Sequence, residues 1–96
     1  MTPLDARLLA ALLLADGRPV PYTALPGRYH LLGEHGGPQR THMARRQMRL
    51  RGLGGCVEWG RFACRMVALP PDWALEDVLA CARELRGAEG LQRRSA

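Results

Sequence analysis

Apolar and polar positions follow a helical period at the start of the chain. Leucines and alanines recur every three to four residues, which predicts an amphipathic helix that begins at Pro3 after a Thr2 cap. Asp5 suits the first turn because its charge opposes the positive end of the helix. Asp16 and Gly17 are expected to end this helix. Its core face is expected to contain Leu4, Leu8, Leu9, Ala11, Leu12 and Ala15.

The next stretch has a weaker pattern. Two prolines flank a valine in residues 18–22, which predicts an extended segment at the edge of a sheet. Thr23 is a candidate cap for a short second helix with Leu25, Tyr29, Leu31 and Leu32 on its apolar side, although Pro26 and Gly27 make its start irregular. Residues 33–37 are expected to form a loop, and Pro38 suits the start of the next helix.

A third helix is predicted over residues 38–51, because apolar and basic side chains separate at steps of about 100°. Gly52 is expected to end it, with Leu53 tucked beneath. The arc expected to face the core consists of Met43, Ala44, Gln47, Met48 and Leu50. The opposite arc consists of Gln39, His42, Arg45, Arg46 and Arg49 and contains no acid.

Residues 56–68 alternate in the manner of a β-hairpin. With Gly60-Arg61 as a two-residue turn, Trp59 is expected to face Phe62, and Val57 to face Cys64. The apolar face then contains Val57, Trp59, Phe62, Cys64 and Met66, and the other face contains Glu58, Arg61, Ala63 and Arg65. We expect Trp59 and Phe62 to be core residues of the hairpin rather than a platform for stacking bases.

Pro70, Pro71 and Asp72 end the hairpin and begin a last helix over residues 73–86. Its apolar stripe is expected to end before Gly87 and contains Leu75, Val78, Leu79, Ala82 and Leu85. Together the elements predict an α+β fold with one domain over residues 1–87 and a flexible basic tail over 88–96. A chain of 96 residues is too short for a credible second domain.

The net charge of +5 comes from the middle of the sequence. Residues 17–66 contain nine arginines and two glutamates, whereas both flanking segments are nearly neutral. A one-sided basic zone predicts a polyanionic partner, most commonly nucleic acid. A solvated basic face without a partner is the alternative, and the scarcity of acids in this zone disfavours it.

The chemistry-bearing residues indicate neither an enzyme nor a metal protein. Cys56, Cys64 and Cys81 lack the paired spacing of a disulfide framework or a zinc site, and no histidine stands at a ligand-like interval from them. Burial as small apolar residues is the favoured interpretation, over redox sensing. The sequence has no paired carboxylates, nucleophile constellation or phosphate loop, so no catalytic residue, cofactor or metal is expected.

The order of the elements resembles the winged helix-turn-helix domain of bacterial transcriptional regulators, over residues 4–69. Its most specific feature is the sequence RRQMRLRGLGG, which runs directly into the hairpin and is similar to the ends of their recognition helices. The resemblance implies a three-helix bundle with a β-hairpin wing, to which this chain adds a C-terminal helix. It also implies that the helix over 38–51 enters the major groove and that hairpin 56–68 touches the flanking DNA.

Carried onto this sequence, the resemblance assigns DNA contacts to Gln39, Thr41, His42, Arg45, Arg46, Arg49, Arg61 and Arg65. Arg61 is the contact at the tip of the wing, and Thr41 and Arg65 are candidate phosphate contacts. For His42, simple exposure is an equally good interpretation.

The expected function is sequence-specific binding of double-stranded DNA by a transcriptional regulator. A winged-helix module that binds protein, including RNA polymerase, and a small RNA-binding protein are the alternatives. The helix over 73–86 is expected either to pair in a homodimer or to pack onto the first helix.

A signal peptide is not expected, because Asp5 precedes the apolar run and no basic leader stands before it. No membrane span is expected either, so a cytoplasmic location is the default.

Overall fold

The computed structural model describes residues 1–33 and 37–95, and the side chains of residues 1–32 and 40–87. The elements run in the order α1 (Pro3–Leu14), β1 (Val20–Pro21), the 3-10 helices η1 (Tyr22–Ala24) and η2 (Gly27–Gly33), α2 (Gly37–Leu50), β2 (Val57–Trp59), β3 (Ala63–Met66) and α3 (Asp72–Ser95). This is an α+β fold, as the sequence predicts, and it is compatible with a winged helix.

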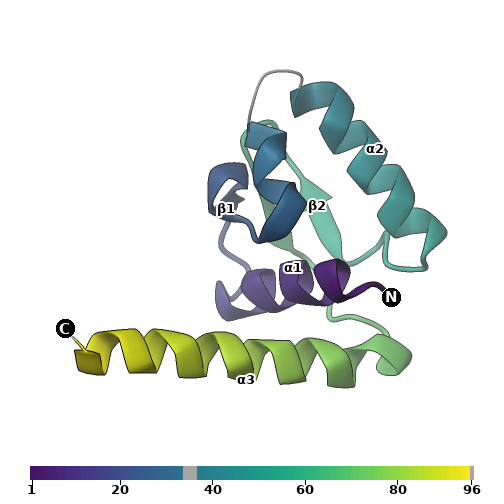
Figure 1. The fold of residues 1–96 in the computed structure, drawn as a ribbon. Coiled ribbons are helices and arrows are strands. Elements are labelled where there is room, and N and C mark those ends of the chain that lie inside the picture. The colour runs from purple at the N-terminus through teal and green to yellow at the C-terminus, as the bar shows by residue number, and fades with distance from the viewer. Residues whose placement is uncertain (34–36, 96) are drawn as a thin grey trace.

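Helix α1 is the centre of the molecule and lies between α3 and the remaining elements (Figure 1). Leu8, Leu9 and Leu12 are fully buried, because the helix is covered on two sides. The predicted start is confirmed: the Asp5 N–H donates to Thr2 Oγ1 at 3.1 Å, and the Asp5 carboxylate accepts from the Thr2 N–H at 3.4 Å. After Leu14 the chain turns through Asp16 with a φ of 53°.

A three-stranded antiparallel sheet has the order β1-β3-β2, which confirms that residues 20–21 form an edge strand. The predicted hairpin turn is wrong. Trp59 pairs with Cys64 and Val57 with Met66, so the turn is Arg61-Phe62, and Phe62 is 74% exposed instead of packed in the core. A hydrogen bond beside β1 supports this hairpin register: the Tyr22 N–H donates to the Phe62 carbonyl at 3.0 Å.

The second predicted helix forms, but as the two 3-10 segments η1 and η2 and not as one α-helix. Pro26 lies between them and cannot donate a backbone hydrogen bond. Gly27 then adopts a φ of +58° with its α-carbon against Leu4, whose Cδ1 lies 2.3 Å from the position that a Cβ would take. Tyr29 and Leu32 are nevertheless buried, as expected.

Helix α3 continues to Ser95, so the end predicted before Gly87 is wrong. Glycine favours a helix end mainly where it takes a positive φ, and Gly87 is not one of the described glycines that do. Ala74, Val78 and Ala82 are buried where α3 packs along α1. The predicted packing onto the first helix is therefore observed, while pairing in a homodimer stays a prediction.

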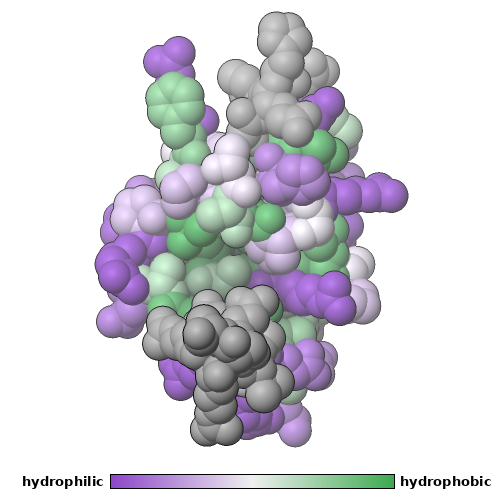
Figure 2. Space-filling view, turned by 60° about the vertical axis from the view of Figure 1, so that its left-hand side comes forward, coloured by the Kyte–Doolittle hydropathy of each residue, from purple (hydrophilic) through white to green (hydrophobic). Residues whose placement is uncertain are grey.

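One hydrophobic core joins the two helical layers to the sheet. On the face shown in Figure 2, apolar side chains gather in a central depression with hydrophilic side chains around it. Cys56 and Cys64 are buried and Cys81 is half-buried, and all three are free thiols. None of the helices in the described part of the chain has both the length and the apolar character needed to cross a bilayer.

Candidate nucleic-acid interface

Helix α2 carries the predicted basic arc on its solvent side. His42, Arg45, Arg46 and Arg49 are all exposed. Within the described part of the chain, the side chains of Arg45, Arg46 and Arg49 form no ion pair, hydrogen bond or ring contact. Gln39 belongs to the helix, but its side chain lies outside the described residues. The structure thus brings four of the predicted groove-facing residues onto one exposed surface.

The opposite arc of α2 differs from the prediction. Met48 is fully buried and Ala44 is half-buried, as expected, but Met43 and Leu50 are 58% and 67% exposed, and Gln47 is exposed as well. Their expected places in the interface are taken by Thr41 and Arg51, which are half-buried. The helix is therefore rotated about its axis relative to the orientation that hydrophobicity alone predicts, and a flank with apolar side chains is exposed beside the basic arc.

A buried carboxylate accounts for this rotation. Arg51 Nη1 lies 3.1 Å from Asp5 Oδ1 and 3.2 Å from Asp5 Oδ2, and Asp5 is only 1% exposed. The Tyr29 hydroxyl donates to Asp5 Oδ1 at 2.9 Å. Burial, followed by the neighbouring Asp5, raises the pKa of Tyr29 well above its usual value. Because a buried carboxylate is costly without partners, Asp5 draws Arg51 inward.

The C-terminal end of α2 is closed by a glycine motif. The Leu53 N–H donates to the Met48 carbonyl at 2.8 Å, and the Gly52 N–H donates to the Arg49 carbonyl at 3.0 Å. Gly52 has a φ of +78°, and Leu53 is fully buried beneath the helix, as predicted. The indole of Trp73 lies beside Gly52 and is 57% exposed. The Trp73 side chain, at the start of α3, thus lies against the turn that ends α2.

Acidic side chains are kept away from the basic arc. Asp5 and Glu58 are each paired with an arginine. The other acids with described side chains are Asp16, at the end of α1, and Asp72, Glu76, Asp77 and Glu84, on α3. Helix α3 lies across α1 from α2 (Figure 1). Most of the described acids thus lie on α3, whereas the arginines of the basic arc lie on α2.

Tyr22 connects α2 to the tip of the hairpin. Its hydroxyl donates to the Gly60 carbonyl. Burial raises the pKa of this hydroxyl, and a hydrogen bond from Thr41 partly offsets that rise. Its ring stacks on Trp59 with a centroid distance of 6.4 Å, and only 1% of Tyr22 is exposed. Thr41, predicted as a phosphate contact, is therefore half-buried and engaged with Tyr22. Arg61, the predicted wing contact, is exposed at the adjoining tip.

Arg65 is committed to another partner. Its Nε and Nη2 each lie 3.2 Å from a carboxylate oxygen of Glu58 on the neighbouring strand. The Arg65 guanidinium lowers the pKa of Glu58, and both side chains are exposed. Because a phosphate would compete with this bidentate pair, Arg65 is a weaker anion contact than Arg45, Arg46 or Arg49.

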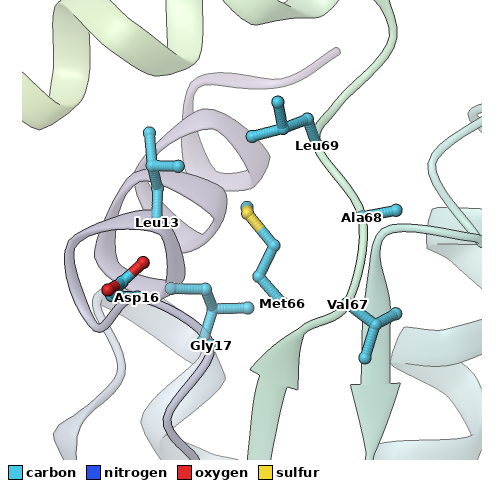
Figure 3. Close-up of a pocket in the computed structure, with 8 residues that line it drawn as sticks. Leu13, Asp16, Gly17, Met66, Val67, Ala68 and Leu69 are labelled. Atoms are coloured by element: carbon cyan, nitrogen blue, oxygen red, sulfur yellow. The ribbon is translucent and has the colours of Figure 1, made fainter.

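Two hollows are lined by residues other than the arginines of the basic arc. One, of about 260 Å³, separates the end of α1 from residues 66–69, and the Met66 side chain points into it (Figure 3). The other, of about 600 Å³, lies between α1, η2 and α2 and is lined by Leu4, Leu31, Met43, Arg28 and Arg40 among others. In the described residues, histidine, cysteine and acidic side chains form no group of three or more that would hold a metal ion.

The sequence interpretation missed the two contacts that orient the arc. The sequence pattern indicates only the cap role of Asp5, and it does not indicate that Tyr22 links the hairpin tip to α2. Local spacing indicates the first role of Asp5, but its pairing with Arg51 spans 46 residues and leaves no periodic signal. Proline restricts φ, so the two prolines around Val20 indicate that Tyr22 follows a conformationally restricted edge strand.

Comparison with known proteins adds no assignment: no family model, curated protein or solved structure matches this chain.

Proposed function

We propose that this chain is a sequence-specific, double-stranded DNA-binding domain of the winged-helix type. The observation that carries the proposal is the basic arc of α2, in which Arg45, Arg46 and Arg49 are exposed and free of internal partners. Guanidinium groups that the fold leaves unpaired on one helix face are available for an external polyanion. The resemblance of the element order to winged helix-turn-helix regulators supports the choice of DNA.

The dimensions of α2 suit the major groove. An α-helix with its side chains is about 10–12 Å in diameter, which matches the width of about 12 Å of the major groove, and the 14 residues of α2 give it a length of about 21 Å. Arginine can bond guanine O6 and N7 with two hydrogen bonds, or it can hold phosphate. In this arrangement Arg45, Arg46 and Arg49 face the groove, with His42 at the same surface and Gln39 in the preceding turn.

The hairpin completes the interface as a wing. Tyr22 links the Gly60 carbonyl, next to Arg61 at the tip, to Thr41 in the N-terminal half of α2. In the proposed complex Arg61 contacts DNA beside the groove that α2 occupies, Thr41 positions the wing through Tyr22, and Arg65 has a minor part because Glu58 holds it. The described acids of α3 lie away from the DNA, which favours this orientation electrostatically.

A transcriptional regulator in the bacterial cytoplasm is the cellular role that fits this activity. RNA polymerase is then a candidate partner, and a homodimer is a candidate assembly. Because Val78 and Ala82 are already buried against α1, a dimer through α3 would have to use exposed side chains such as Leu79, which is 40% exposed. Two half-sites about one DNA turn apart would be expected of such a dimer.

Selection of binding sites from random duplex DNA at two salt concentrations tests the proposal. We expect enrichment of one sequence at the lower concentration and weaker enrichment at the higher one, because phosphate contacts release counterions. The triple variant Arg45→Gln/Arg46→Gln/Arg49→Gln is the matched control and should enrich nothing while remaining folded. Absence of enrichment by the wild-type protein at low salt would contradict the proposal, and preferential capture of competing RNA would favour an RNA-binding protein.

A protein-interaction module is the second candidate, and the exposed apolar side chains beside the arc favour it. Met43 and Leu50 lie on α2, and Trp73 adjoins its C-terminal end at Gly52. Exposed aromatic and methionine side chains are enriched at protein interfaces. If this surface binds protein, Leu50→Ser and Trp73→Ser should abolish capture of RNA polymerase while the triple arginine variant retains it.

A further inference from the structure

The tip of the hairpin exposes an aromatic ring that the fold could have buried. Phe62 is 74% exposed, the largest fraction among the described large apolar side chains. Under the turn that the sequence pattern predicts, Phe62 would face Trp59 in the core. The observed turn, Arg61-Phe62, instead directs the ring outward at the end of the sheet. A single exposed phenylalanine is ordinary on a protein surface, so a role for Phe62 has to be argued from the other features of the hairpin tip.

The backbone on both sides of Phe62 is held in place. The Tyr22 N–H donates to the Phe62 carbonyl at 3.0 Å, and the Gly60 N–H donates to the Ala63 carbonyl at 2.9 Å. The Tyr22 hydroxyl also donates to the Gly60 carbonyl. A Cβ at position 60 would lie 2.8 Å from the Ala63 carbonyl oxygen, so the turn is tight. The exposed ring is consequently presented on a rigid support.

A guanidinium group accompanies the ring. Arg61 Cζ lies 5.2 Å from the centroid of the Phe62 ring, within the range of a cation–π contact. Such contacts are weak where water surrounds them, so a phosphate can draw Arg61 away. Departure of Arg61 would leave one face of the ring open for stacking. The tip therefore combines an apolar ring with a cation beside it, a pairing that suits DNA better than an uncharged apolar partner.

We propose that Phe62 is a wedge that inserts partly between two adjacent base pairs next to the site of α2, while Arg61 moves from the ring to a phosphate. The inference rests on the proposed function and adds to it a deformation of the DNA by the wing. Apolar side chains that enter from the minor groove unstack a base step and kink the duplex in this manner. The link through Tyr22 and Thr41 places the wedge at a fixed offset from the arginines of α2.

A wedge at a fixed offset predicts a sequence preference without hydrogen bonds to bases. Pyrimidine–purine steps such as TA and CA unstack most easily, so such a step is expected on the flank of the selected site where Phe62 lies. Replacing it with a stiff A-tract should weaken binding by wild-type protein and leave binding by Phe62→Ala nearly unchanged.

Fluorescence of 2-aminopurine tests the insertion directly, because this base brightens when it is unstacked. It is placed at successive flanking steps of the selected duplex, and wild-type protein is compared with Phe62→Ala, Phe62→Leu and Leu69→Ala. Leu69 is 65% exposed and lies away from the tip in sequence, so it serves as the matched control for loss of an exposed apolar side chain. We expect brightening at one step with wild-type protein, Phe62→Leu and Leu69→Ala.

With Phe62→Ala we expect no brightening and an affinity lower by about tenfold, which is the size of losing one aromatic stacking contact. Equal brightening by Phe62→Ala and wild type, or no brightening by wild type at any step despite tight binding, would overturn the wedge and leave the proposed function intact. Failure of the wild-type protein to bind any duplex would overturn both, and the selection experiment identifies that case.

Discussion

Asp5 and Arg51, 46 residues apart, join the first turn of α1 to the end of α2 through an ion pair with Nη1 3.1 Å from Oδ1. The Asp5 carboxylate also accepts from the Thr2 N–H in the cap of α1 and from the Tyr29 hydroxyl. Because Arg51 points inward, the arginines that precede it by two, five and six positions point outward. The pair thus fixes which face of α2 is offered to a partner.

Breaking this pair should destabilise the fold and disorganise the basic arc. In Arg51→Met the Asp5 carboxylate stays buried with only Tyr29 and the helix cap as partners, so we expect the free energy of unfolding to fall by about 3 kcal/mol. Urea denaturation measures this loss, and Asp77→Asn, which changes an exposed acid of α3, is the control. A change of less than about 1 kcal/mol in Arg51→Met would show that the pair does not hold α2.

Tyr22 should affect DNA binding although it is buried and cannot touch DNA. Tyr22→Phe keeps the ring and removes the hydroxyl that donates to Gly60 and bonds to Thr41. We expect a loss of about 1 kcal/mol in unfolding free energy and a weaker affinity for the selected duplex, because the wing is no longer tied to α2. Thr41→Val should produce a smaller loss of the same kind. Unchanged affinity in both variants, measured by fluorescence anisotropy, would argue against a tied wing.

Stability should decline in alkali through Cys64. Burial raises the pKa of this thiol from its usual 9.0 to about 12. Because the folded pKa lies above the unfolded one, the contribution is fully present below pH 9 and is lost as the pH rises toward 12, by at most about 1.4 kcal/mol per unit. Urea unfolding between pH 8.5 and 10.5 should show this slope, and Cys64→Ala should flatten it. An equal slope in both proteins would assign the loss to the other buried groups with raised pKa values, Cys56, Tyr22 and Tyr29.

Two glycines should respond in opposite directions to alanine. Gly27 has a φ of +58°, and its Cβ would meet Leu4, so Gly27→Ala is expected to cost about 1–2 kcal/mol. Gly87 lies in the open on α3, and Gly87→Ala should add up to about 1 kcal/mol because alanine favours the helix. Thermal unfolding should show a lower melting temperature for Gly27→Ala and a higher one for Gly87→Ala than for the wild-type protein. Stabilisation by Gly27→Ala would mean that η2 does not require the left-handed turn.

The sequence predicted the elements whose signals are local. The cap at Thr2, the helix end at Gly52 and the edge strand at Val20 depend on residues within a few positions of each other, and the structure confirms them. The basic surface was also predictable, because Arg45 and Arg49 share a helix face through their spacing alone.

Long-range partners explain most of what the sequence did not predict. Periodicity predicted Met43 and Leu50 to face the core. Thr41 and Arg51 face inward instead and are half-buried, because Tyr22 and Asp5 offer them polar partners. Likewise, alternation alone does not fix a hairpin register. A shift of two positions keeps each strand residue on its face, and only the pairing of β1 with β3 selects the turn that exposes Phe62.

The salt dependence of duplex binding tests the central claim most directly, that the unpaired arginines of α2 hold DNA. The measurement is the slope of log affinity against log salt for wild-type protein, Arg46→Gln and Arg83→Gln, with Arg83 as an exposed control on α3. We expect Arg46→Gln to bind more weakly with a slope shallower by about 1, and Arg83→Gln to match wild type. Identical slopes and affinities for all three proteins would contradict the claim.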